Sequence, residues 1–217
     1  ATAGARFKVS APQSASDNLQ TLRIALPAKP ISGVADTMMV DNAALPLDTL
    51  WVGQSARPIT VRYNDKLATQ ADTCSLVRDT KQINITLRDL DNPAGLDVND
   101  FTFTITDRNA AVDGYNTVDE RTTLRYTPYA TWNTTDPINT ASVTTYPNTN
   151  DAQAPGRMAH ADFMTSRIIY HSGADAAHNA QLVIYNKRTQ QNVVCIDLAD
   201  FLQRLRSSAE RNYTAQE

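Results

Sequence analysis

The sequence predicts an all-β protein of β-sandwich architecture with one short amphipathic helix near the C-terminus. Apolar and polar residues alternate along many short runs, which is the pattern of strands that bury one face. Clusters of Asn, Asp, Pro and Gly separate the runs and indicate turns. A helical repeat of apolar residues stands out in one place, close to the end of the chain. Many short strands separated by turns are typical of β-sandwiches.

Three runs show the strand pattern most clearly. Residues 82–88 place polar side chains at even positions, with apolar ones between them, which predicts one face in water. Residues 101–106 alternate Thr with Phe or Ile, and β-branched Thr suits the outward side of a pleated strand. Residues 22–26 repeat the alternation. Shorter strands are expected at residues 6–9, 49–52, 59–63, 122–126, 163–170, 182–185 and 192–196.

The predicted helix begins after Asp197, whose side chain can cap the first turn. Apolar residues then recur at helical spacing, and we expect Arg204 and Arg206 to face solvent. A single amphipathic helix in a β protein usually covers a sheet edge or the end of a sandwich. Its apolar face comprises Leu198, Phe201, Leu202 and Leu205.

Two segments lack strand periodicity and are predicted to be long connections or surface insertions. Residues 28–47 contain prolines and a glycine, and residues 131–161 are rich in Thr, Asn and Pro. The polar segment 64–72 separates two groups of predicted strands, so we place a domain boundary near residues 71–74. The predicted domains are residues 1–73 and residues 74–217.

The composition excludes two classes of partner. A net charge of −3 at pH 7 leaves no basic stripe, so we expect no nucleic-acid binding. No apolar run reaches the roughly 18 residues that a membrane-spanning helix needs. The chain begins at Ala1 without an initiator Met or a signal-peptide apolar region, and is expected to be a processed or trimmed product.

The two cysteines, Cys74 and Cys195, lie in strand-like runs, where a lone cysteine is most often a small buried hydrophobic residue. Neither has a second cysteine nearby, which excludes the paired spacing of common zinc sites. A disulfide between them stays open as an alternative, because connectivity cannot be deduced from sequence.

The sequence lacks the common catalytic signatures: a glycine-rich phosphate loop, a G-x-S-x-G elbow and an H-E-x-x-H motif. His160 with Asp162, and His171 with Asp175, could serve as metal ligands or acid–base pairs. We expect these histidines instead to lie on loops beside the strand at 163–170 and to face solvent. The chain is therefore predicted not to be an enzyme and to have no catalytic, cofactor-binding or metal site.

Asp107, Asn109, Asp113 and Asn116 form the densest cluster of polar side chains, and oxygens at such intervals could hold calcium. The favoured interpretation is a connection between strands. Asn and Asp tolerate left-handed backbone conformations and form side-chain turns, which such a connection needs.

Three aromatic residues, Tyr126, Tyr129 and Trp132, lie close together. Aromatic rings on a flat face can stack on the apolar face of a sugar. Tyr126 and Tyr129 are expected in the core or at its rim, whereas Trp132 lies in the threonine-rich segment and is the better candidate for an exposed contact. Trp132 and Tyr129 are the residues that we predict for contact with a partner.

Several runs in order resemble the FimB/Mfa-type minor fimbrial (anchor) subunits of Bacteroidetes fimbriae. Residues 76–87 look like the strand that opens the second domain of that family. Residues 103–109, followed by residues 113–116, are similar to its I-x-D-x-N-G…Y-D/x-N signature, and residues 123–129 match the next strand. The likeness spans roughly residues 45–217 and also includes residues 182–185, 193–194, 196–198 and 214–217.

The resemblance implies two transthyretin-like β-sandwich domains, held at the outer membrane by a lipidated N-terminal cysteine. It also implies a role in anchoring a fimbrial shaft and limiting its length. The chain departs from the family in lacking that cysteine and in stopping at Glu217, where relatives continue into further strands. We therefore expect the first domain to be incomplete and a sheet edge to be open for strand addition by another fimbrial subunit.

The leading hypothesis is a non-enzymatic anchor or accessory pilin of the cell-surface fimbrium, acting in assembly and cell adhesion. Its expected partners are other fimbrial subunits, the outer membrane through an N-terminal lipid, and a host protein or glycan. The alternative is a carbohydrate-binding surface module that uses Trp132 and neighbouring tyrosines. A hydrolase appended to such a sandwich would need His160 or His171 as reactive groups.

Overall fold

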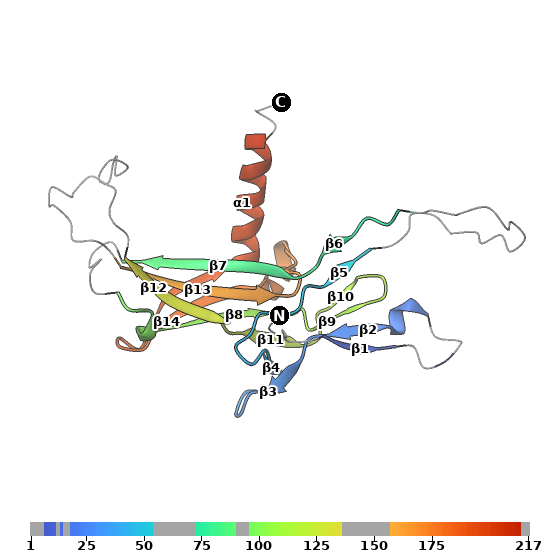
Figure 1. The fold of residues 1–217 in the computed structure, drawn as a ribbon, viewed down its shortest axis with the longest axis horizontal. Coiled ribbons are helices and arrows are strands. Elements are labelled where there is room, and N and C mark those ends of the chain that lie inside the picture. The colour runs from blue at the N-terminus through green and yellow to red at the C-terminus, as the bar shows by residue number, and fades with distance from the viewer. Residues whose placement is uncertain are drawn as a thin grey trace, which may run out of the picture.

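The protein folds into β-sheets with one α-helix at the C-terminal end (Figure 1). The computed structural model describes residues 7–11, 14, 18–53, 73–89, 96–135 and 157–213. Over these residues the strands form sheets of six, four, three and two strands. The all-β sandwich class with a C-terminal helix, predicted from the sequence, is confirmed.

The six-stranded sheet is the largest and follows the order β15-β14-β8-β11-β4-β3. Its neighbouring strands are antiparallel except β11 and β4, which run parallel. In β8, Phe103 and Ile105 are buried while the threonines between them are only partly covered, as the sequence alternation predicts. The strands are β3 (Ala28–Pro30), β4 (Thr37–Val40), β8 (Phe101–Asp107), β11 (Thr123–Tyr126), β14 (Gln181–Asn186) and β15 (Gln191–Asp197).

The three-stranded sheet lies over the core and has the order β12-β13-β7. Both pairings are antiparallel. Its central strand β13 fully buries three residues of its inner face, Ala159, Ala161 and Phe163. The strands are β7 (Lys81–Arg88), β12 (Ala130–Thr135) and β13 (Arg157–Thr165).

Two smaller sheets complete the strands of the described part. The four-stranded sheet contains β1 (Lys8–Ser10), β2 (Arg23–Ala25), β9 (Ala111–Asp113) and β10 (Val118–Asp119). The two-stranded sheet pairs β5 (Trp51–Val52) with β6 (Val77–Arg78). Three short 3₁₀ helices connect strands: η1 (Leu19–Thr21), η2 (Val98–Asp100) and η3 (Gly173–His178).

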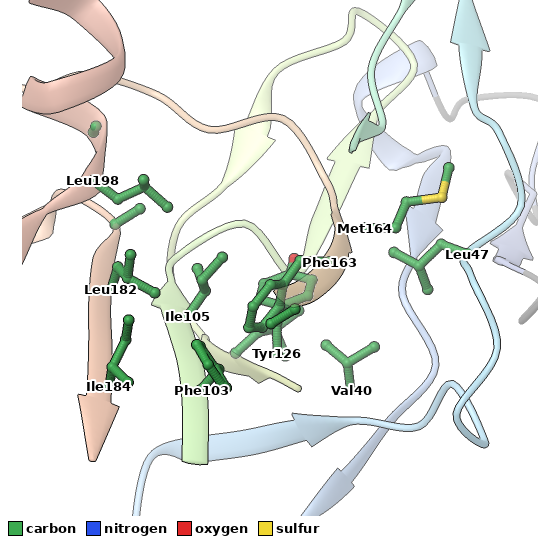
Figure 2. Packing of buried hydrophobic residues seen from close by; sticks show 14 of the residues in the cluster. Val40, Leu47, Phe103, Ile105, Tyr126, Phe163, Met164, Leu182, Ile184 and Leu198 are labelled. Atoms are coloured by element: carbon green, nitrogen blue, oxygen red, sulfur yellow. The ribbon is translucent and has the colours of Figure 1, made fainter. Parts of the chain in front are cut away.

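The hydrophobic core lies between the six-stranded and the three-stranded sheet. Phe163 of β13 belongs to the same buried cluster as Ile105 of β8 and Tyr126 of β11 (Figure 2). Each such side chain contributes roughly 1.5–3 kcal/mol when it is fully buried. The six-stranded sheet supplies Phe103, Ile105, Leu124, Tyr126, Leu182 and Ile184 to this core.

The helix α1 (Leu198–Tyr213) begins where the sequence predicts it. Oδ1 of Asp197 accepts the backbone N–H of Asp200 at 2.8 Å, which caps the first turn. Leu198 is buried, but Phe201 and Leu205 are 48% and 52% exposed, because α1 projects away from the sheets (Figure 1). The helix therefore covers the sandwich with its first turns only, which is less than its predicted apolar face.

An ion pair lies on the exposed side of α1. Nε of Arg204 pairs with Oδ2 of Asp200 at 2.8 Å, whereas the side chain of Arg206 lies outside the described side chains. No helix in the described part of the chain has the length and apolar character that a membrane crossing requires.

Both segments predicted to be irregular contain strands. Residues 28–47 include β3 and β4, and β4 is held by parallel pairing with β11, a partner that lies more than eighty residues away. Residues 131–161 include most of β12 and the start of β13; the stretch 136–156 lies outside the described residues. Long-range pairing stabilises these strands, and local sequence carries little sign of it.

Other expected strands shift or fall outside the description. The strand expected at 163–170 is displaced toward the N-terminus, because β13 ends at Thr165. The strand expected at 59–63 lies outside the described residues. The shorter strands predicted near the N-terminus and after residue 122 are present with shifted ends.

The predicted burial of the two cysteines is wrong, since Cys74 and Cys195 are both exposed and free. In β15 the core-facing positions belong to Val194 and Ile196, which pack against the core. Because side chains alternate along a strand, Cys195 between them points to the outer face.

Strands from both sides of residue 73 share three sheets, including the pair of β5 with β6. β2 pairs with β9, and β4 pairs with β11, so continuous backbone hydrogen bonding joins the two predicted domains. The polar segment 64–72 that suggested the boundary lies outside the described residues. The division into residues 1–73 and 74–217 stays a prediction.

A buried polar network crosses the core beside these strands. The hydroxyl of Tyr126 donates to Oδ1 of Asn109 at 2.5 Å, and Nδ2 of Asn109 donates to Oδ2 of Asp107 at 2.7 Å. The backbone N–H of Arg108 donates to the other oxygen of Asp107 at 2.7 Å. Burial raises the pKa of Asp107 to about 7, and the nearby charge of Glu120 adds to this rise.

Replacing Phe163 tests the central role of β13 in the core. Because its ring is fully buried, Phe163→Ala is expected to lower the free energy of unfolding by about 3–5 kcal/mol. Urea denaturation followed by circular dichroism measures the change. The matched control Val193→Ala, on an exposed position of β15, is expected to change stability by less than about 0.5 kcal/mol. Equal losses in the two variants would contradict the assignment.

The raised pKa of Asp107 predicts a pH-dependent stability. The folded protein holds a proton on Asp107 that the unfolded chain releases near pH 4, so this contribution is full below pH 4 and is lost as pH rises through about 7. Within that window it amounts to on the order of 1.4 kcal/mol per pH unit. Chemical denaturation between pH 4 and 8 measures the slope, which should flatten in Asp107→Asn. A control, Asp175→Asn at an exposed site, should keep the wild-type slope.

Candidate functional site

The outer face of the three-stranded sheet carries an ordered set of aromatic and polar side chains. We call this surface the open face, and it comprises Gln82, Asn84 and Thr86 of β7, Trp132 and Thr134 of β12, and His160 and Asp162 of β13. It exists because side chains alternate along each strand. The residues of β13 that lie between the buried ones in the sequence therefore point outward.

Trp132 and His160 stack on one another across β12 and β13. They are paired in register, and their ring centroids lie 5.1 Å apart with an angle of 11° between the planes. The same row continues to Thr86 of β7. This stack fixes the indole of Trp132, which remains 37% exposed.

Hydrogen bonds hold the polar side chains of the open face in place. Nε2 of His160 lies 2.6 Å from Oγ1 of Thr134, and its Nδ1 lies 3.1 Å from Oγ1 of Thr86. One row away, Nδ2 of Asn84 donates to Oδ1 of Asp162 at 2.5 Å. Each of the three strands therefore contributes to a preorganised surface whose side chains lose little freedom on binding.

Tyr129 extends this network at the start of β12. Its hydroxyl accepts from Nε2 of Gln82 at 3.0 Å and donates to Oδ2 of Asp162 at 3.4 Å. Partial burial, with the negative charge of Asp162, raises the pKa of Tyr129, so the phenol stays protonated near neutral pH. Tyr129 and Trp132, the two contact residues predicted from sequence, thus belong to one surface.

His160 does not lie on a loop, as the sequence suggested, but in the middle of β13. Its predicted partner Asp162 is on the same face, yet the carboxylate of Asp162 is engaged by Asn84 and Tyr129. The sequence pattern did not identify Asn84 and Thr86 as neighbours of His160. The polar even positions of the strand predicted at 82–88 were the available signal, but its pairing partner could not be read from sequence.

His171 lies apart from the open face. Its Nε2 is 3.4 Å from Oε2 of Glu120, and its ring meets that of His178 edge-on at 6.0 Å between centroids. Its acidic neighbour is therefore Glu120 and not Asp175, the partner suggested by sequence. The arrangement places His171 against the connection that follows β10.

The cluster proposed for calcium is divided among structural roles. Asp107 and Asn109 belong to the buried network, where their polar atoms bond to each other and to backbone groups. Oδ1 of Asp113 accepts the backbone N–H of Tyr115 and of Thr117, which forms a side-chain turn. Across the described ranges, no group of three or more His, Cys, Asp or Glu side chains is placed to hold a metal ion.

Asn116 shows why the turn interpretation holds. Its backbone φ of 64° lies in the left-handed region, which Asn accepts more readily than most residues. Its carbonyl accepts from the guanidinium of Arg167, whose other nitrogen lies 3.9 Å from the buried carboxylate of Asp79. The loop is thus held against the start of β7 by charge-assisted contacts.

Each sheet ends in strands that pair on one side only within the described ranges. The six-stranded sheet ends in β15 and β3, the three-stranded sheet in β12 and β7, and the four-stranded sheet in β1 and β10. Such edges present backbone N–H and C=O groups that a further strand can pair with. The molecule therefore offers two kinds of contact surface, sheet edges and the open face.

Several solved structures share this fold. A proposed adhesin of Bacteroides thetaiotaomicron matches 93% of this chain and 57% of its own, with a TM-score of 0.65 and 19% identity. A proposed polysaccharide-binding protein of the same species matches 90% and 55%, with a TM-score of 0.59 and 21% identity. The fimbrial anchor protein Mfa2 from Porphyromonas gingivalis matches 90% and 56%, with a TM-score of 0.51 and 15% identity.

The chain spans just over half the length of each of these structures. At such low identities the similarity shows a common fold. No curated protein sequence matches the chain. The family model of the fimbrillin-A associated anchor proteins Mfa1 and Mfa2, in contrast, matches residues 10–217, which is nearly the whole sequence. The resemblance inferred from residue patterns is thereby confirmed: this chain belongs to the family of fimbrillin-A associated anchor proteins Mfa1 and Mfa2.

Proposed function

We propose that the chain is part of a cell-surface anchor or accessory subunit of a fimbrium, and that it acts by pairing strands with other fimbrial subunits. The observation that carries this proposal is the family match over residues 10–217, in a fold whose sheets end, among the described residues, in strands paired on one side. The work of such a subunit is assembly, which needs directional contacts and no reactive centre.

Strand pairing suits this task for a physical reason. A sheet edge offers backbone donors and acceptors in a fixed row, so an added strand gains many hydrogen bonds in one defined register. Pockets for alternate side chains then select the partner. The proposal includes attachment to the outer membrane through a lipidated cysteine upstream of Ala1, as in the family that the sequence resembles.

Deletion of the encoding gene in its bacterium tests the anchor function. If the chain anchors the shaft and limits its length, deletion should release fimbriae into the medium and lengthen them. Electron microscopy of cells and immunoblotting of culture supernatants measure both effects, with a plasmid-borne copy as the control. Fimbriae that stay attached at normal length would contradict the proposal.

A second candidate function is binding of a saccharide at the open face. The stacked ring of Trp132 gives a rigid aromatic surface, and Asn84, Asp162 and Thr86 supply hydrogen-bonding groups beside it. This combination suits a sugar, which has an apolar face and equatorial hydroxyls. One protein of the same fold is described as a proposed polysaccharide-binding protein.

Substitution of Trp132 tests the saccharide hypothesis. Trp132→Ala removes the ring on which a sugar would stack, so affinity for a bound glycan is expected to fall at least tenfold, or about 1.4 kcal/mol. A glycan array followed by calorimetry measures this. Trp51→Ala is the matched control, because Trp51 is 54% exposed and lies on a different sheet. The absence of saturable glycan binding, or an equal loss in both variants, would count against the hypothesis.

A further inference from the structure

The edge strands of the described part differ in how well they could accept another strand. β3 has only three residues and includes Lys29 and Pro30, which are typical protections of a sheet edge. β1 and β10 are also short, with three and two residues. η2 lies next to β12, where Oδ1 of Asn133 accepts the backbone N–H of Val98 at 2.8 Å.

β5 and β6, the two strands of the smallest sheet, have only two residues each, which leaves the edges of β15 and β7. The pairing of β15 with β14 shifts register between Ile184 and Tyr185, and such a bulge twists a strand away from further pairing. β7, in contrast, pairs with β13 over all eight of its residues without a shift. It contains no proline, and its six central residues, 82–87, are uncharged and rich in β-formers. We call the side of β7 opposite β13 the β7 edge.

The inner residues of β7 are incompletely covered. Ile83, Ile85 and Leu87 contact the core but remain partly exposed, whereas Phe163 on the neighbouring strand is fully buried. The apolar inner face of the sheet thus extends to its edge strand β7, and no described residue covers it fully there. A strand added at the β7 edge would cover this row with its own inward side chains.

A hollow of about 760 Å³ adjoins the first residues of β7. Its apolar lining includes Ile83, Ile168 and Leu202, the last from α1. Its size falls in the range of ligand-binding clefts, so it can receive bulky side chains of a segment that runs along the β7 edge.

One exposed positive charge lies at this hollow, that of Lys81. The lining also includes Arg167, whose guanidinium faces the buried carboxylate of Asp79, and it contains no Asp or Glu. Nζ of Lys81 donates to the backbone oxygen of Arg78 at 2.9 Å. In the described part of the chain, the ammonium group of Lys81 has no acidic partner. An occupant with a carboxylate at this end would satisfy Lys81.

From these features we infer that the β7 edge and its hollow form the strand-accepting site of this chain. The occupant is an extended segment of another polypeptide that alternates apolar with polar residues and carries an acidic residue near Lys81. The inference rests on the proposed function, because it assigns to one edge the strand pairing proposed there. The backbone row of β7 makes the occupant a strand, and the charge of Lys81 favours an acidic residue in the occupant beside it.

Amide exchange on the 217-residue chain tests the site directly. The probe is a ten-residue peptide that alternates valine with threonine and carries one glutamate near its end; a lysine version and a version with alternating prolines are controls. Saturable binding of the glutamate peptide should slow hydrogen exchange in β7. Slowing in β12 or β15 instead, or equal binding of the proline peptide, would overturn the inference.

Two variants on one rung of the sheet sharpen the test. Ile85 and Thr131 both lie opposite Ala161, on the two edge strands of the same sheet. Ile85→Lys places a charged side chain on the inner face of β7, at the β7 edge, and should weaken peptide binding at least tenfold. Thr131→Lys adds the same charge to the opposite edge and should leave binding unchanged. Unaltered binding by Ile85→Lys contradicts the site.

A third variant, Lys81→Glu, tests the charge of the occupant. It should reverse the preference from the glutamate peptide to the lysine peptide, and an unchanged preference would contradict the assigned charge. Because Lys81 is exposed, this variant and the exchange map of the wild type remain decisive if Ile85→Lys fails to fold.

The outcome separates this inference from the anchor function. If β7 is not protected while gene deletion still releases fimbriae, the assigned edge is wrong and the proposed function stands. If β7 is protected but deletion leaves the fimbriae attached, the strand site stands and the anchor function fails.

Discussion

The packing of β13 against the six-stranded sheet is the constraint on which the rest of the structure depends. Its inner row combines two alanines with Phe163, so the sheets can approach closely at Ala159 and Ala161 while the phenyl ring fills the space beside Ile105 and Tyr126. β12 and β7 are held in place because both pair with β13. Without this strand, neither side of the three-stranded sheet would have a backbone partner among the described residues.

The same strand determines the outer surface. Since side chains alternate along a strand, the register that buries Phe163 also directs His160 and Asp162 outward. His160 meets Trp132 on one side and Thr86 on the other, which links the open face to the core through one backbone. A slip of one residue would expose the core row and bury the polar row, so the core and the surface stabilise each other's register.

A buried carboxyl in the core and an edge strand with an uncharged centre are both unusual in a folded protein. Asp107 retains its proton more strongly than an ordinary carboxyl because it is buried, and the β7 edge carries few of the features that usually prevent a sheet edge from pairing. The family to which the chain belongs consists of proteins associated with fimbriae, which are assemblies of subunits. A sheet edge that can accept a strand promotes unwanted pairing in an isolated monomer, but it provides a contact between subunits in such an assembly.

The sequence by itself determined the elements whose signal is local. Alternation predicted the strands around Ile83 and Ile105, and the capping residue Asp197 predicted the start of α1. The polar cluster near Asp113 was predicted as a turn because Asn and Asp accept that backbone geometry. For the candidate surface, the sequence named Trp132, Tyr129, His160 and Asp162, although contact of Trp132 and Tyr129 with a partner stays a prediction, and it did not connect them with Asn84 and Thr86.

Only the tertiary structure decided which strands meet. β4 exists through its parallel pairing with β11, and the contact between Trp132 and His160 joins residues separated by the long segment 136–156. The exposure of Cys195 and the single-sided pairing of β7 depend on the same long-range register. Local propensity decides which residues can form a strand. The partners of a strand, its covered face and its free edge depend on how strands pair, and the sequence of one strand alone does not show which strand it pairs with.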